Sequence, residues 1–172
     1  MSLDGFIARP DGGLDWLLGA GAGLGDTGYD DFFASVDSMV LGRNTYDIVA
    51  GFDEYPYAGK RVLVLSTTLK SIDWPDATVH RTIDDALATL ARENRNHVYV
   101  DGGTVVQQFL RAGMLDNLTV SIAPVLIGFG IPLFGLLDND ITLELTGTRE
   151  LGSGFTQATY RPVRSGREAS RT

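Results

Sequence analysis

Short apolar runs rich in β-branched residues alternate along the chain with segments of helical periodicity. The clearest runs are Arg61–Leu65 (RVLVL) and His97–Val100 (HVYV), which are too short to be helices. Strands that alternate with helices form parallel sheets covered by helices. The pattern predicts an α/β fold. Because no repeat or linker interrupts it, we expect a single domain over residues 1–161 of the 172.

The remaining elements follow from the same patterns. The expected strands are Leu3–Ala8, Ser38–Leu41, Arg61–Leu65, Thr78–His80, His97–Val100, Leu118–Leu126, Ile141–Thr148 and Phe155–Tyr160. The expected helices are Tyr29–Val36, Arg43–Ala50, Ile83–Glu93 and Gly103–Arg111. Residues 14–25 (LDWLLGAGAGLG) are interpreted as a glycine-dense loop, either a mobile lid or flexible filler. Residues 162–172 are interpreted as a disordered basic tail.

Charge and composition exclude several kinds of chemistry. Four of the fourteen bases lie in residues 161–172, so residues 1–160 carry ten bases against twenty-one acids. A body this acidic repels a phosphate backbone, and we expect no nucleic-acid partner. With no cysteine and only His80 and His97, the chain has no thiol nucleophile, no Cys-type zinc site and little for a histidine-based centre. We expect no metal.

Residues 117–137 are uncharged and long enough to cross a bilayer. Pro124, Pro132 and three glycines interrupt them, which favours a buried strand that runs into a loop. The N-terminus has no basic segment followed by an apolar run, so it does not look like a signal peptide. We therefore expect a cytoplasmic protein without a membrane partner.

Two junctions between a strand and a helix have the character of anion-binding sites. At the first, Gly42 ends a strand, and Arg43 and Thr45 open the next helix. A helix N-terminus presents unpaired N–H groups to an anion, and a guanidinium adds a bidentate fork. The alternative is that Arg43 forms only an i,i+4 ion pair with Asp47.

The second junction carries Gly102 and Gly103 between a buried strand and a helix that begins with Thr104 and Val105. Paired glycines let the backbone approach a ligand closely, although many such turns use them without a ligand. Ser66 and Thr67 follow another strand, where hydroxyls either bind phosphate or form a turn.

Taken in order, these motifs resemble the dihydrofolate-reductase-like superfamily. Within it, the chain resembles most the reductase domain of the bifunctional riboflavin-biosynthesis deaminase-reductase and its stand-alone relatives. The motifs that carry the resemblance, over residues 2–160, are Ser2–Ala8, Leu41–Tyr46, Val64–Thr67, Val100–Gly103, Gln108–Leu110, Leu115–Leu118, Ile122–Gly128 and Gly130–Phe134.

The resemblance implies a three-layer α/β sandwich with a mostly parallel central sheet and an antiparallel C-terminal hairpin. It also implies NADPH as cofactor. By position, Arg43 and Thr45 would hold the adenosine 2′-phosphate, with Leu65, Ser66 and Thr67 beside them, and Gly42 would end the strand before them. Gly102, Gly103, Thr104 and Val105 would wrap the pyrophosphate and the nicotinamide ribose, and Ile7 and Ala8 would line the nicotinamide.

The leading hypothesis is an NADPH-dependent reductase of the riboflavin-pathway pyrimidine reductase type, which transfers a hydride to a C=N or C=O bond of a small molecule. One alternative is a dihydrofolate reductase, although Trp16 is followed by residues 17–19 (LLG) without the proline of those enzymes. The other is a non-catalytic NADPH-binding sensor. The candidates for proton delivery are Asp4 and Asp30. The alternative is that Asp4 only forms a turn with Gly5 and that Asp30 only lies on a solvated helix face. Family members commonly pair through the C-terminal region, so we expect a homodimer.

Overall fold

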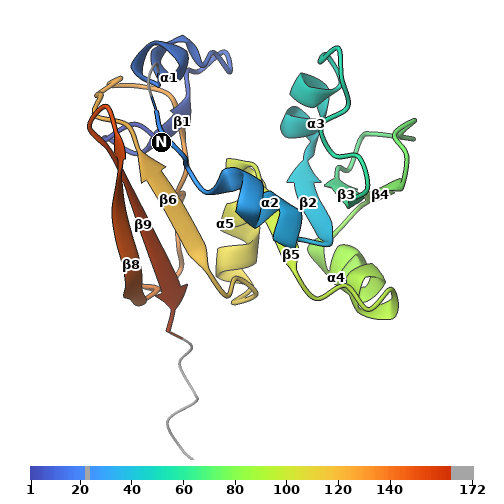
Figure 1. Cartoon of the computed structure of the whole chain (residues 1–172). Coiled ribbons are helices and arrows are strands. Elements are labelled where there is room, and N and C mark those ends of the chain that lie inside the picture. Colours follow the sequence, from blue (N-terminus) through green and yellow to red (C-terminus); the bar gives the residue numbers. More distant parts are fainter. Residues whose placement is uncertain (22–23, 164–172) are drawn as a thin grey trace, which may run out of the picture. The chain divides into compact units, whose positions relative to one another are not determined.

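The computed structural model (Figure 1) describes residues 1–21 and 24–163. It divides into two compact units, one of Gly28–Phe109 and one of Met1–Thr27 with Leu110–Thr172. We call the first the parallel unit and the second the antiparallel unit, after their sheets, and describe each by itself. The prediction of a disordered tail over residues 162–172 is wrong at Pro162, which belongs to a strand, and from position 164 onward it lies outside the described residues.

The parallel unit is built on four strands in the order β4-β3-β2-β5, all parallel (Figure 1). The strands are β2 (Ser38–Gly42), β3 (Arg61–Leu65), β4 (Ala77–His80) and β5 (Val98–Asp101). The helices are α2 (Tyr29–Ser35), α3 (Arg43–Val49), α4 (Ile83–Arg92) and α5 (Gly103–Arg111), the last of which ends in the antiparallel unit. These elements match the predicted ones to within one residue at either end, because apolar β-branched runs and capped amphipathic segments are strong local signals.

One face of this sheet carries an aromatic layer. Side chains alternate along a strand, so Met39 and Leu41 of β2 share a face with Tyr99 and Asp101 of β5, their partners in the register. That face packs against rings from two helices and two loops: Phe33, Tyr46, Tyr55, Tyr57 and Trp74. Residues 39–41 of β2 and 62–64 of β3 are all fully buried, so both faces of the central strands are covered, as the unbroken apolar run of Arg61–Leu65 predicts.

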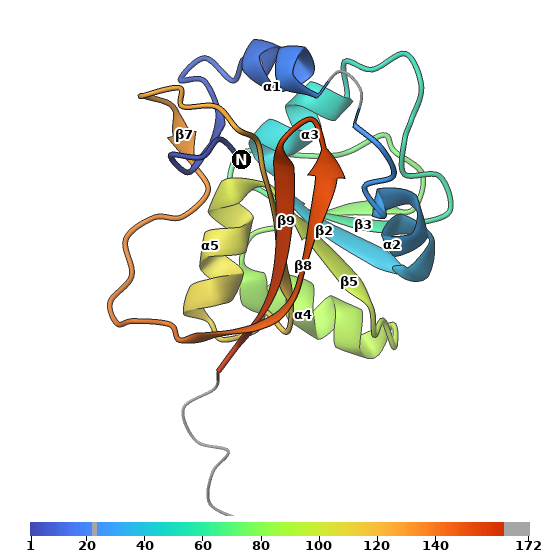
Figure 2. The same ribbon diagram turned by 60° about the vertical axis from the view of Figure 1, so that its left-hand side comes forward.

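The antiparallel unit contains a three-stranded sheet in the order β6-β9-β8 and a two-stranded pair of β1 and β7. Its elements are β1 (Phe6–Ala8), α1 (Asp15–Ala20), β6 (Leu118–Ile122), β7 (Ile131–Pro132), β8 (Leu143–Gly152) and β9 (Phe155–Pro162). Figure 2 shows β8 and β9 as a long hairpin. Gly152, Ser153 and Gly154 of its turn have positive φ. Glycine adopts positive φ without steric cost, so this glycine-rich sequence forms the hairpin turn that it predicts.

Several predictions for this unit were wrong in detail, and β8 spans Leu143–Gly152 rather than the expected Ile141–Thr148. Residues 15–20 form helix α1 rather than loop, because Trp16 is buried in an apolar cluster with Leu151 and Phe155; residues 22 and 23 of the predicted lid lie outside the described part. The first strand starts at Phe6, since residues 2–5 form a turn that needs Gly5 at a φ of 90°. Strand β6 ends at Ile122, because Pro124 cannot donate to a sheet.

The segment that follows β6 exposes apolar side chains. Leu126, Phe129 and Leu136 are 68%, 74% and 91% exposed, so the prediction of a buried segment fails beyond Ala123. Among residues 1–21 and 24–163, no helix is long and apolar enough to cross a membrane.

Large exposed apolar side chains in one segment are typical of a protein interface. We therefore keep the prediction of a homodimer through the C-terminal region, and light scattering should give twice the chain mass of 18.5 kDa. Phe129→Ser should lower the dimer fraction, because it removes apolar area from the predicted interface. Leu18→Ser is the matched control, since Leu18 is 76% exposed but belongs to α1. A mass of 18.5 kDa at micromolar concentration would contradict the prediction.

Candidate functional site

The strand order of the parallel unit creates a topological switch point between β2 and β5. From β2 the chain moves outward to β3 and β4, and it then returns to pair β5 with the other side of β2. Ligands of open α/β sheets bind outside the carboxyl ends of the strands at such a point. Here the two carboxyl ends are the junctions at Gly42 and Gly102, so the structure brings together the two anion sites that the sequence predicts.

These two junctions approach so closely that side chains would not fit. A Cβ at Gly102 would lie 2.8 Å from Thr45 Oγ1, and the residue has a φ of 89°. A Cβ at Gly42 would lie 3.2 Å from a methyl group of Val105. The glycines therefore permit direct packing of the start of α3 against the start of α5.

The first turn of α5 points unpaired donors at this edge of the sheet. The amide of Val106 donates to the carbonyl of Gly102 at 2.9 Å and closes the first helical turn. The amides of Gly103, Thr104 and Val105 precede that bond and belong to the first turn, whose N–H groups have no helical acceptor. A glycine cradle followed by such a turn fits the pyrophosphate of a dinucleotide. The side chain of Val105 is buried, so only its backbone could face a ligand.

Arg43 forms the ion pair that was the alternative to phosphate binding. Its Nε donates to both carboxylate oxygens of Asp47, at 2.8 and 2.7 Å, and both side chains are about half exposed. An exposed i,i+4 pair contributes only about 0.3–0.5 kcal/mol to stability. Such a weak pair does not prevent the guanidinium from turning to an anion.

The residues after β3 continue the same edge. Leu65 is the register partner of Gly42, so Ser66 and Thr67 follow directly beside the first junction. The Ser66 hydroxyl accepts from the amides of Thr68 and Leu69, which is the turn-forming role. The guanidinium of Arg81 donates to the Ser66 carbonyl. Sequence analysis missed this second cation, because only the parallel pairing of β3 and β4 brings position 81 to Ser66.

Asp101, at the carboxyl end of β5, is the acid that the switch point positions best. Its Oδ1 accepts from the amide of Gly102 at 2.8 Å, and the Tyr99 hydroxyl donates to the same carboxyl group. Burial raises the pKa of Asp101 above its usual range, and these two hydrogen bonds oppose the shift. A raised pKa at a ligand-binding edge is characteristic of functional carboxyl groups.

The two acids that the sequence favours belong to other elements of the fold. Asp4 precedes β1 and accepts hydrogen bonds from the Ser2 hydroxyl at 2.6 Å and from the Gly128 amide at 2.7 Å. The hydrogen bond from Ser2 contributes most to lowering the pKa of Asp4, which favours the turn-forming interpretation over proton donation. Asp30 is exposed in the first turn of α2, as a solvated helix residue would be. Their catalytic roles stay predictions.

Ile7 and Ala8, predicted to line the nicotinamide, lie in β1 of the antiparallel unit. Strand β1 pairs with β7, and a Cβ at Gly130 would collide with the carbonyl oxygen of Ala8. The glycine of the Gly130–Phe134 motif is therefore explained by the close passage of this segment over β1.

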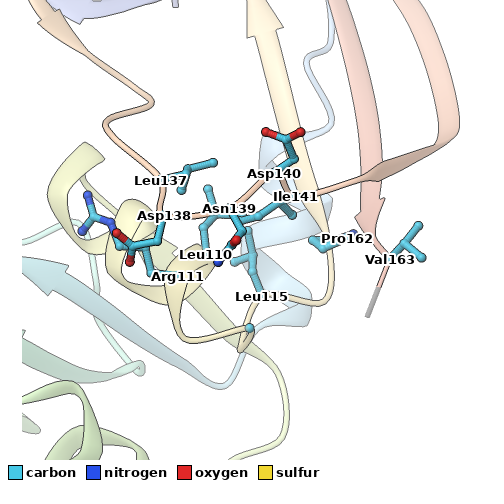
Figure 3. Close-up of a pocket in the computed structure, with 11 residues that line it drawn as sticks. Leu110, Arg111, Leu115, Leu137, Asp138, Asn139, Asp140, Ile141, Pro162 and Val163 are labelled. Carbon is cyan, nitrogen blue, oxygen red and sulfur yellow. The ribbon is translucent and has the colours of Figure 1, made fainter. Parts of the chain in front are cut away.

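The antiparallel unit also contains a pocket of about 420 Å³ (Figure 3). It lies between the end of α5, residues 137–141 and the end of β9, and Figure 3 shows Arg111 and Asp138 on one side with Asp140 pointing away from them. None of the predicted site residues lines it. We take the carboxyl edge of the parallel sheet as the candidate site, because it combines open backbone donors, cations and a perturbed acid.

A parallel sheet with a glycine-lined switch point and an antiparallel C-terminal hairpin defines an α/β protein of the dihydrofolate-reductase-like class, as the sequence predicts. Within this class, the chain belongs to the RibD C-terminal domain family, whose model matches residues 1–157.

Individual proteins agree with this assignment. The uncharacterized protein YwjB of Bacillus subtilis is 36% identical over 155 residues, which cover 88% of each chain. A crystal structure from Shewanella sp. PV-4, of a protein that its description links to riboflavin biosynthesis, has a TM-score of 0.85 at 34% identity and covers 95% of this chain and 96% of its own. The riboflavin biosynthesis protein RibD of Corynebacterium ammoniagenes is 27% identical over 169 residues, which cover 87% of this chain but 48% of RibD. The chain thus spans about half the length of RibD.

The close junction can be tested by stability measurements. Gly102→Ala should lower the free energy of unfolding by more than Gly59→Ala, as measured by urea denaturation. Both residues have positive φ, 89° and 78°, but a Cβ at Gly59 meets nothing within 4 Å. The control therefore measures backbone strain alone, about 1–2 kcal/mol. Adding Thr45→Ala to Gly102→Ala should recover part of the loss. Equal losses in the two single variants would contradict the close approach.

Proposed function

We propose that this protein is an NADPH-dependent reductase of the pyrimidine reductase type, which reduces a C=N or C=O bond of a small ring or carbonyl compound. The observation that carries the proposal is the pair of glycine junctions at the switch point, with the first-turn amides of α5 beside them. Membership in the RibD C-terminal domain family supports the same reaction class.

The parallel unit offers separate contacts for the two charged parts of the cofactor. The amides of Gly103 and Thr104 would bind the pyrophosphate. Arg43 and Thr45, with Ser66 and Thr67 beside them and Arg81 behind Ser66, would hold the 2′-phosphate. Gly42 and Leu65 would form the floor between these contacts, because they are paired in the register. When bound, NADPH supplies the hydride, so the chain needs no metal or nucleophile of its own.

Reduction also consumes a proton, and the geometry favours Asp101 as its donor. A general acid works best when its pKa lies near the working pH. Asp101 approaches that condition through burial, whereas the pKa of Asp4 is lowered by its hydrogen bonds. Tyr99 holds the Asp101 carboxyl group in place through its hydroxyl. We therefore place Asp101 ahead of Asp4 and Asp30 in this role.

Cofactor preference tests the first part of this proposal. Arg43→Ala should weaken NADPH binding by roughly ten- to a hundredfold and leave NADH nearly unchanged, because a charge-assisted contact contributes about 1.5–3 kcal/mol. Titration calorimetry with each cofactor measures both affinities. Asp47→Asn is the control, since it removes the ion-pair partner of Arg43 but leaves the positive charge of Arg43 in place. Equal losses for NADPH and NADH would refute the 2′-phosphate assignment, and no cofactor binding at all would refute the reductase.

Turnover tests the second part. On the fastest substrate from a panel of pteridines, aminopyrimidines and small carbonyls, Asp101→Asn should lower kcat by about 10²–10⁴-fold and leave NADPH affinity unchanged. The wild-type rate should fall as the pH rises through the raised pKa of Asp101, since the acid must be protonated to donate, and the variant should lose this dependence.

Asp31→Asn is the control, because Asp31 is exposed on α2 and its substitution changes the net charge by the same amount. Dihydrofolate in the panel tests the dihydrofolate reductase alternative. If Asp101→Asn keeps the wild-type kcat and Asp4→Asn or Asp30→Asn lowers it, the proton donor is the acid that the sequence favours and not Asp101.

A further inference from the structure

Arg81 lies in the short connection between β4 and α4. Strand β4 ends at His80, and only Arg81 and Thr82 separate it from the helix. On the strand side, the His80 carbonyl accepts from the Ser66 amide at 3.0 Å. On the helix side, the Thr82 hydroxyl accepts from the Asp85 amide at 3.2 Å and caps α4. The backbone of Arg81 is therefore held at both of its neighbours.

Two side chains connect the ends of this short segment. Nδ1 of His80 lies 2.8 Å from Oδ2 of Asp85. A carboxylate only accepts hydrogen bonds, so Nδ1 carries a proton and donates it. The other ring nitrogen, Nε2, lies 2.8 Å from the Thr78 hydroxyl, so the ring has a partner on each side and its orientation is fixed. We call His80, Thr82 and Asp85 the β4–α4 clamp.

The two side chains of the ion pair differ in burial. The His80 side chain is 7% exposed, whereas the Asp85 side chain is 56% exposed. A buried polar group that loses its partner destabilises the fold, so the intact bond restrains the ring. Asp85 is not one of the buried residues of α4, so its carboxylate can be removed without a change in the apolar core.

The clamp and the proposed 2′-phosphate contacts share Arg81 and Ser66. The Arg81 guanidinium donates to the Ser66 carbonyl, and the Ser66 hydroxyl accepts from the amides of Thr68 and Leu69. A guanidinium binds phosphate best in a fixed bidentate orientation. Ordering a long side chain costs conformational entropy, and a backbone that is already held lowers the cost of binding.

We propose that His80 and Asp85 are positioning residues for NADPH, which hold the backbone of Arg81 where its guanidinium meets the 2′-phosphate. They act through Arg81 rather than on the cofactor itself. The proposal rests on the reductase function proposed above, and it adds a determinant of the preference for NADPH over NADH.

The variant Asp85→Ala tests this role, because it removes the carboxylate that holds His80 and keeps the amide that donates to Thr82. NADPH affinity of the full chain should fall by about three- to tenfold, which is the contribution of one hydrogen bond. NADH affinity should stay within about twofold, because NADH has no 2′-phosphate for Arg81 to recognise. Titration calorimetry measures both.

Asp84→Ala is the matched control. Asp84 is exposed in the same first turn of α4, so its substitution removes the same charge beside the phosphate contacts without touching His80. Both affinities should stay within about twofold, because an exposed charge is screened by solvent.

Two further variants separate positioning from a general loss of structure. Asp85→Asn keeps an oxygen that accepts from His80 Nδ1, so it should retain most of the NADPH affinity. Arg81→Ala should weaken NADPH binding, and Asp85→Ala added to it should cause no further loss, because the clamp acts through Arg81.

Three results would overturn the positioning role and leave the proposed function intact: equal NADPH affinity in Asp85→Ala and Asp84→Ala, equal losses for NADPH and NADH in Asp85→Ala, or additive losses in the double variant. A wild-type chain that binds no NADPH would refute the proposed function, and the positioning role would fall with it.

Discussion

The close packing of two strand-to-helix junctions determines the rest of the parallel unit. Strand β2 is the centre of the sheet, with β3 on one side and β5 on the other, so the starts of α3 and α5 must share one edge. They fit only because Gly42 and Gly102 have no side chain where Thr45 and Val105 pass. The same packing leaves backbone amides and a carboxyl group at this edge, where an open α/β sheet binds its ligand. The steric requirement of the fold and the chemistry of the site therefore have a common origin.

The sequence was most informative where local signals agree with the tertiary structure. Short buried strands, such as Arg61–Leu65, cannot be exposed on either face, and their apolar residues identify them directly. The helix α4 has a Thr82 cap whose hydroxyl accepts from Asp85, a signal that can be read without a structure. The glycine junctions were also predicted, because an unusual backbone needs an unusual residue.

The sequence failed where a residue's role depends on distant partners. The sequence predicts a loop at Trp16 because residues 14–25 are rich in glycine, yet burial of Trp16 against Leu151 and Phe155 stabilises a helix. Asp4 looked like a candidate acid, yet the amides that hold it belong to Ile127 and Gly128, more than a hundred residues away. Arg81 and Asp101 are recognised as site residues only once the strands are paired, because the pairing brings them to the carboxyl edge of the sheet. The sequence does not show whether a titratable side chain is buried, so its pKa cannot be predicted from the residue type alone.

The charged groups at the carboxyl edge come from different strands, and their positions bear on the proposed cofactor contacts. Arg43 and Arg81 follow β2 and β4, whereas Asp101 and Tyr99 lie in β5. A dinucleotide with its 2′-phosphate at the basic end would extend its pyrophosphate along α5 toward the acid. The anionic parts of the cofactor would then meet the cations of this edge. An acidic chain would thus bind a polyanionic cofactor through the few cations that lie at this edge of the sheet, Arg43 and Arg81.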